Sequence, residues 1–412
     1  MLKNKEDFIM GINSRKINND SSTYAQIIRN ERLRRHMTLE DASKDICSVS
    51  YLCKLENSTI RTNETFVRSL CERFCIDYDV IDKAEIENIV QEAIKFVFLK
   101  KDNEVEELYK KIENLPFNSR TQIVKCFYLL QRADYQTFKE EVKYLDNIKY
   151  TLTDIESVTL IYLVVLYYIG IHNYNEAYKY LKLSDMIKVN NKFLKYLLLE
   201  ANILVSYNIN NYCRLINSYI QYERIDITGY PLGRKLVAKM INNAFMCEEY
   251  PSEVLDDINN LDMQIVPCDS KLDIIYYMMI IKIKNGHLSE LFREMIDKSY
   301  YFDARFMGLL AYIAYMVNKK SLYKELLSLL ETYVFEDVDA IHQKFVYFIV
   351  LYATSKNKDD VIKYLKEHIN PHIETEINPI YNRIYKKIYL EHTVNASKYK
   401  ESYYFLANHP RW

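Results

Sequence analysis

The stretch TLEDASKDICSVSYLCKLEN, residues 38–57, carries the start signals of two short helices in succession. Thr38 followed by Asp41 is a variant of the capping box, in which a hydroxyl and a carboxylate satisfy free amides at a helix start. Ser48 is a second residue of the type preferred at the amino end of a helix. The stretch therefore predicts a helix, a short turn and another helix.

Apolar residues in and after this stretch predict a small shared core. Ala42 and Ile46 lie on one face of the first helix, and Leu52 and Leu55, three residues apart, form the buried side of the second. A further helix would close this core with three residues at four-residue spacing: Phe66, Leu70 and Phe74.

Residues 38–57 resemble the helix-turn-helix of the repressor-like, Xre-type family, in which a serine opens the second helix and Leu-Glu closes it. The resemblance implies that residues 48–57 form a recognition helix, which lies in the major groove of DNA. Six residues are expected at the DNA: Thr38, Ser48, Val49, Ser50, Tyr51 and Lys54. By this resemblance, Val49, Ser50 and Lys54 match positions that reach bases. Lys54 can donate to guanine, and Val49 can contact a thymine methyl group. Ser48 and Tyr51 match positions that contact phosphates in that family.

Two positions depart from the family pattern, and one pair follows it. Ile46 stands where the family usually has glycine, and Asn57 with Ser58 replaces the closing glycine. Asparagine tolerates the left-handed conformation, so the second departure is mild. Arg32 and Glu56 match a pair that ties the first helix of the family's domain to the end of the recognition helix. The resemblance therefore implies a partly buried ion pair between them.

The composition of the whole chain indicates an all-α protein. Its 412 residues include only 6 Gly and 7 Pro, which is typical of long helices with few tight turns. The net charge of -1 excludes a uniformly basic protein that coats nucleic acid. DNA binding must then be confined to one module, and residues 24–80 are the predicted DNA-binding domain. The polar residues 1–23 precede it as an arm.

Residues 84–412 are predicted to form helix pairs at a repeating period. The pairs begin near residues 84, 118, 154, 191, 231, 269, 303, 339 and 376. These spacings are close to the 34-residue period of a tetratricopeptide array. The segment 157–187 fits the repeat pattern best, with Tyr168, Ala177 and Leu181 at its spacing. We expect a right-handed superhelix whose concave wall consists of the first helix of each pair.

Two groups of polar side chains are candidates for binding an extended peptide on that wall. Asn202 and the neighbours Asn242 and Asn243 lie in apolar first helices, and a carboxamide can both donate to and accept from a peptide backbone. A hydrogen bond between repeats, or a helix cap, explains each asparagine equally well. Weaker candidates for the same wall are Tyr162, Tyr207, Tyr276 and Tyr315.

The combination of the two domains resembles the Rgg, PlcR and PrgX type of regulator, the RRNPP family of Gram-positive bacteria and their phages. The resemblance implies a homodimer that binds a double-stranded DNA operator and is controlled by a short signalling peptide in the concave groove, as in quorum sensing. Two alternatives stay open from the residues alone. The repeats could be a scaffold that docks another protein, or the chain could be a constitutive repressor whose repeats only dimerise.

Several other classes of function are not expected. The eight cysteines include no Cys-x-x-Cys pair, so we expect reduced thiols, no metal and no cofactor. The sequence has no glycine-rich phosphate loop, no H-E-x-x-H and no G-x-S-x-G, and an enzyme is therefore not expected. The longest apolar stretch, residues 160–171, is too short for a membrane span. These features predict a cytoplasmic protein without a membrane partner.

Overall fold

A computed structural model of the chain describes residues 22–57, 59–60, 62–78, 88–115, 118–225, 231–246, 263–264, 268–284, 286, 288–335, 340–370, 379–395 and 397–408. Every regular element in these residues is a helix, which confirms the expected all-α class. Residues 1–21 of the expected arm lie outside the described residues, and the first helix starts at Ser22. No helix in the described part of the chain has both the length and the apolar character needed to cross a membrane.

The contacts within the chain divide it into two compact units. The first consists of residues 1–167 and 179–198, and the second of residues 168–178 and 199–412. The domain boundary that the sequence predicted, between residues 80 and 84, lies within the first unit. The helices before residue 80 therefore belong to the same compact unit as the helices that directly follow residue 84.

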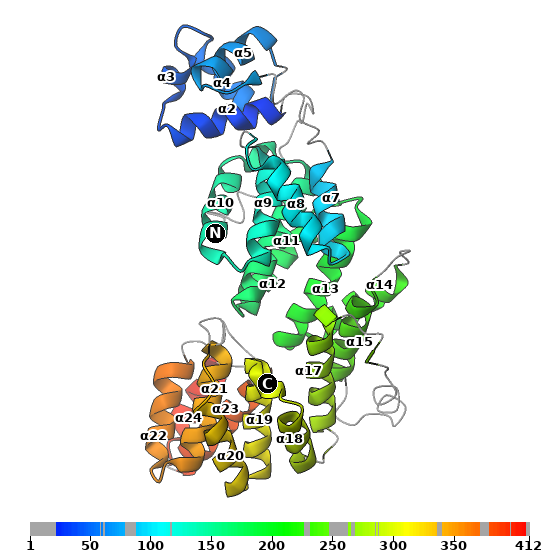
Figure 1. Ribbon diagram of the computed structural model, residues 1–412. Coiled ribbons are helices and arrows are strands. Elements are labelled where there is room, and N and C mark those ends of the chain that lie inside the picture. The colour runs from blue at the N-terminus through cyan, green and yellow to red at the C-terminus, as the bar shows by residue number, and fades with distance from the viewer. Residues whose placement is uncertain are drawn as a thin grey trace. The chain divides into compact units, whose positions relative to one another are not determined.

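The first unit begins with a bundle of four helices, drawn in blue in Figure 1: α2 (Ser22–Arg34), α3 (Leu39–Ser43), α4 (Val49–Glu56) and α5 (Glu64–Arg73). We call this bundle the head. Its core consists of Ile28, Ala42, Leu52, Leu55, Val67, Leu70, Cys71 and Phe74. Phe66 was expected there too, but it is half-buried and its ring contacts Tyr51 at 5.0 Å between centroids. The buried side of α5 instead includes Val67 and Cys71, because a helix buries positions three and four residues apart.

The rest of the first unit consists of helices that pack on their neighbours in the chain. Helix α7 packs on both α8 and α9, and α9 packs on α10. The elements after the head, of which the last three cross into the second unit, are α7 (Ile89–Phe98), α8 (Asp102–Ile112), α9 (Ser119–Gln131), α10 (Tyr135–Asn147), the 3-10 helix η2 (Lys149–Thr151), α11 (Asp154–Gly170), α12 (Tyr174–Ser184) and α13 (Lys192–Asn208).

The second unit continues this arrangement. Helix α17 contacts α15, α18 and α19, and α19 in turn contacts α20 and α21. Its further elements are α14 (Tyr212–Arg224), α15 (Leu232–Met246), α17 (Cys268–Lys284), α18 (Leu288–Asp297), η3 (Tyr300–Phe302), α19 (Ala304–Val317), α20 (Lys320–Leu330), α21 (Ala340–Thr354), α22 (Lys358–Tyr364), the π-helical turn η5 (Leu365–Ile369), α23 (Pro379–Asn395) and α24 (Tyr399–Asn408).

The first helix of each pair starts close to the position that the sequence predicted. Helix α11 starts at Asp154, and α9 and α13 start at Ser119 and Lys192, one residue after the predicted 118 and 191. The largest difference is at α7, which starts at Ile89 rather than near residue 84. Polar caps fix several of these starts. Asn118, for example, caps α9 through its side chain.

Candidate nucleic-acid interface

The start of α3 is fixed by the predicted capping box. The Asp41 amide donates to Thr38 Oγ1 at 3.1 Å, and the Thr38 amide donates to Asp41 Oδ2 at 3.3 Å. The Thr38 hydroxyl also donates to Asp41 Oδ2 at 2.8 Å, and these hydrogen bonds hold the pKa of the Asp41 carboxyl below its usual value. Thr38 is exposed, so its position is compatible with a contact to DNA.

The turn between α3 and α4 does not need a glycine at position 46. Asp45, the residue before it, has the left-handed φ of 61°, which aspartate tolerates better than most residues. The Ile46 amide donates to the Ser43 carbonyl at 3.0 Å, which closes the turn. At the other end of α4, Asn57 has φ -94°. Asn57, which ends the helix, is therefore not in the left-handed conformation that asparagine tolerates.

Helix α4 places one face in the core and the other toward solvent. Ser48 caps it, since its Oγ accepts from the Tyr51 amide at 3.1 Å. Leu52 and Leu55 are fully buried, whereas Ser48, Ser50 and Lys54 are exposed and Val49 is half-buried. The ammonium group of Lys54 has no ion-pair partner among the described residues. Three expected DNA-contacting side chains thus lie on one accessible face.

Tyr51 has a second role in the head besides the expected phosphate contact. Its hydroxyl oxygen accepts from the Asn63 amide at 2.8 Å, and its ring packs edge-on against Phe66. These contacts fix the start of α5 relative to α4. The hydroxyl hydrogen is not used in that bond, so it can still donate to a phosphate oxygen.

Arg32 and Glu56 form the ion pair that the resemblance implied. Arg32 Nε lies 2.6 Å from Glu56 Oε1 and Nη2 lies 2.7 Å from Oε2, a two-point contact between planar groups. The side chain of Glu56 is 3% exposed and that of Arg32 is 11% exposed. The hydrogen bond to Glu56 raises the pKa of Arg32 further. The pair joins α2 to the last residue of α4.

Sequence reasoning missed three other arginines that hold the head together. Arg29 Nη1 donates to Asn57 Oδ1 at 2.9 Å, just beyond α4. Arg73 Nη1 donates to the Ala42 carbonyl at 2.9 Å, and Arg35 Nη2 donates to the Phe74 carbonyl at 2.5 Å. Arg73 and Arg35 thus satisfy backbone carbonyls that helix ends leave unpaired, whereas Arg29 binds a side-chain oxygen. No pattern in the sequence distinguishes them from surface cations.

The seven candidates for peptide binding do not come together in one unit. Tyr162 belongs to the first unit, where its ring lies near Phe127, and the other six belong to the second. The amide oxygen of the buried Asn202 accepts from Arg214 Nε at 2.5 Å. This hydrogen bond joins α13 to α14, the two helices of one predicted pair, rather than two repeats.

The remaining peptide-binding candidates differ in exposure. Asn242 and Asn243 are half-buried on α15. Tyr207 and Tyr276 are buried, and both rings contact Tyr277 edge-on, at 5.6 Å and 5.3 Å between centroids. Tyr315 is half-buried and contacts Tyr352. Of these residues, Asn242, Asn243 and Tyr315 are therefore partly accessible to solvent.

The described residues contain no group of three or more His, Cys, Asp or Glu side chains that could hold a metal ion. Comparison of the chain with protein-family models, with curated proteins and with solved structures found no match. The geometry of the head is therefore the main basis for a functional assignment.

Proposed function

We propose that the chain is a DNA-binding transcription regulator whose head reads a double-stranded operator through α4. The observation that carries this proposal is the division of α4 into two faces. Leu52 and Leu55 are buried in the core of the head, while Ser50 and Lys54 are exposed on the opposite side. A helix held in this way can enter the major groove, which is wide enough for one helix.

The exposed side chains of α4 suit the chemistry of DNA. Lys54 offers a cation to guanine O6 and N7, and the hydroxyl of Ser50 can donate to or accept from any base edge. Ser48 and Tyr51 can donate to phosphates, which would set the register of the helix on the duplex. The Arg32–Glu56 pair supports this role, because it fixes α4 against α2 without using an exposed side chain of α4.

We further propose that a short peptide controls the regulator and that it acts as a homodimer, as the resemblance to the RRNPP family implies. The regular spacing of the helix pairs after the head supports a superhelical array with a ligand-binding wall. A peptide that binds one curvature of such an array better than another shifts the population of the two states. Asn242 and Asn243 are the side chains that we assign to the peptide backbone.

The DNA-binding proposal can be tested by selecting duplexes from a random pool with the full chain. Lys54→Ala should weaken binding to the selected duplex about tenfold or more, with little effect on random duplex, since one good base contact contributes about 1–3 kcal/mol. Lys143→Ala on α10, also an exposed lysine, is the matched control and should leave both affinities unchanged. Equal loss on both duplexes would contradict base recognition by Lys54.

The peptide proposal needs a separate measurement. A thermal-shift screen with synthetic peptides encoded in small reading frames beside the gene should reveal one that raises the melting temperature of the chain. Asn242→Ala combined with Asn243→Ala should abolish that response. A chain that binds its operator but responds to no such peptide would instead be a constitutive repressor or a scaffold for another protein.

A further inference from the structure

Helix α2 has a second buried face that the core of the head does not explain. Ala25, Gln26, Ile27 and Asn30 are all at most 6% exposed. None of them belongs to the core cluster of the head, to which α2 contributes Ile28. A different part of the first unit must therefore cover this face.

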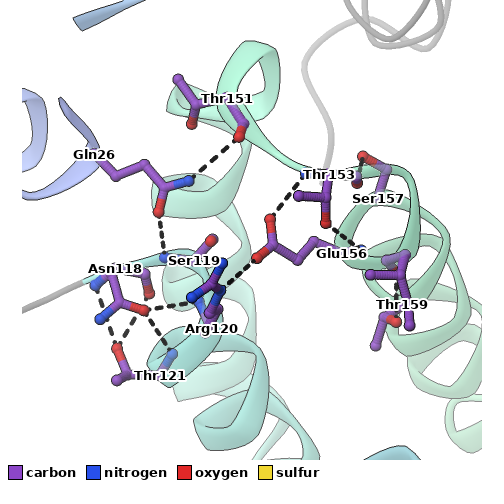
Figure 2. Close-up of polar contacts among 11 residues, drawn as sticks. Gln26, Asn118, Ser119, Arg120, Thr121, Thr151, Thr153, Glu156, Ser157 and Thr159 are labelled. Carbon is purple, nitrogen blue, oxygen red and sulfur yellow. Dashed lines mark hydrogen bonds and ion pairs between the residues drawn. The ribbon is translucent and has the colours of Figure 1, made fainter. Parts of the chain in front are cut away.

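Gln26 identifies the surface that covers it, as Figure 2 shows. Its Nε2 donates to the Thr151 carbonyl at 3.4 Å, and its Oε1 accepts from the Ser119 amide at 2.8 Å. Gln26 is 2% exposed, so both hydrogen bonds lie away from solvent. Thr151 ends η2, and Ser119 is the first residue of α9. The amide of Gln26 thus joins the head to two elements beyond it.

The bond to Ser119 completes the cap of α9. The first amides of a helix have no acceptor within it. Asn118 Oδ1 accepts from the amides of Arg120 and Thr121, at 2.9 Å and 3.0 Å. The amide of Ser119 is left, and Gln26 accepts from it. Among the residues that the structure describes, the Ser119 amide of α9 is therefore protected by a side chain of the head alone.

The surface under Gln26 is itself tied together by polar contacts. Arg120 Nε lies 3.3 Å from Glu156 Oε1, which joins the starts of α9 and α11. Glu156 Oε2 also accepts from the Thr153 amide at 2.9 Å. Both charged side chains are largely buried, at 20% and 5% exposed. Figure 2 shows these contacts beside those of Gln26, so a shift of α11 against α9 would alter the surface on which the head rests.

We propose that Gln26 is a positioning residue, which fixes the head on the start of α9 and on η2 and so sets the direction in which α4 is presented. Because Gln26 lies on the buried side of α2, it does not compete with DNA for any exposed residue of α4. The effect of Gln26 on DNA binding rests on the function proposed above, whereas the docking of the head on α9 and η2 does not. In a dimer, two heads fixed in this way would accept only one spacing of operator half-sites.

Hydrogen exchange of the full chain, resolved to single amides, tests the docking directly. Gln26→Leu should accelerate exchange of the Ser119 amide about tenfold, since the variant removes the acceptor that this amide has in the described part of the chain. Asn30→Leu is the matched control: Asn30 lies one turn further along α2, is 6% exposed, and has no hydrogen-bond partner for its side chain among the described residues. In this variant the Ser119 amide should exchange as in the parent.

Protection of amides in the core of α11 shows whether each variant is still folded. If these amides remain protected and Ser119 exchanges equally slowly in Gln26→Leu and the parent, Gln26 does not hold the head. Acceleration of the same size in Asn30→Leu would also overturn the proposal, because general loosening of the interface would then explain it.

Operator spacing supplies the second readout. The parent should discriminate at least tenfold between its selected duplex and one whose half-sites are moved by about five base pairs, half a helical turn. Gln26→Leu should lose most of that discrimination while its affinity for a single half-site stays within about twofold of the parent. Retained discrimination would contradict the positioning role. If no variant binds DNA but Ser119 responds as expected, the docking stands and the proposed function fails.

Discussion

Arg32 on α2 and Glu56 at the end of α4 form a two-point ion pair, with nitrogen–oxygen distances of 2.6 Å and 2.7 Å. Glu56 is almost completely buried, and the guanidinium group of Arg32 lies against its carboxylate. The contact fixes the end of the helix that we expect to read DNA, while the Ser48 cap fixes its beginning.

Glu56→Gln should destabilise the head by about 3 kcal/mol, because it leaves the guanidinium of Arg32 partly buried without a countercharge. The matched control is Glu64→Gln, since Glu64 pairs with Arg68 in the same bundle but both side chains are exposed. That change should cost less than about 0.5 kcal/mol. Hydrogen exchange of α4 amides in the full chain measures the loss of stability in both variants. Equal losses would show that burial of the Arg32–Glu56 pair is unimportant.

Gly308→Ala should destabilise the second unit by about 3 kcal/mol. A Cβ at this position would overlap the hydroxyl oxygen of Tyr381 and lie 2.9 Å from its Cζ. Tyr381 is held there by a 2.6 Å hydrogen bond with His342 Nδ1. The double variant Gly308→Ala with Tyr381→Phe should lose less stability than the sum of the single variants, because the overlapping oxygen is gone. Simple additivity in thermal unfolding would refute the steric explanation.

Lys386 should make the second unit more stable at high pH than at neutral pH. Burial lowers the pKa of this lysine from 10.5 to about 8. The unfolded chain therefore binds more protons than the folded chain between pH 8 and pH 10.5, and stability rises across that window. Lys386→Met should stabilise the protein by about 3 kcal/mol below pH 8, and the gain should vanish above pH 10.5. A gain independent of pH in denaturant unfolding would count against this explanation.

Two cysteines near the end of α5 should differ sharply in reactivity. Cys71 is 1% exposed and its burial raises the pKa of its thiol to about 11, whereas Cys75 is exposed. Because the thiolate is the nucleophile, iodoacetamide at pH 8 should modify Cys75 and leave Cys71 intact until the head unfolds. Mass spectrometry of the labelled chain measures the modification of each cysteine. Comparable labelling of both residues would mean that Cys71 is not in a closed core.

Much of the fold could be predicted because its signals are local in the sequence. The capping box of Thr38 and Asp41 and the cap at Ser48 involve residues three apart, so the sequence itself brings the partners together. Helix starts such as Asp154 followed from the spacing of apolar runs. The Arg32–Glu56 contact spans 24 residues and was reached only through a family resemblance.

The contacts that could not be predicted join distant parts of the chain. Gln26 lies 93 residues before Ser119 and 125 before Thr151, and a glutamine within the apolar run YAQII gives no sign of which carbonyl or amide it meets. The same limit applies to Asn202. Its apolar surroundings suggested a ligand or a neighbouring repeat, and only the placement of Arg214 on α14 decides what its oxygen contacts. Periodicity predicts helices, whereas such pairings depend on how the helices pack.

The most direct test of the account is whether α4 touches base pairs. A photo-crosslinking amino acid at position 50, on the exposed face of α4, should crosslink to a base within the selected duplex. The same group at the exposed position 72 of α5 is the control and should give little product. Efficient crosslinking from position 50 to one base position is the predicted result. Crosslinking from position 72 but not from position 50 would contradict the claim that α4 reads DNA.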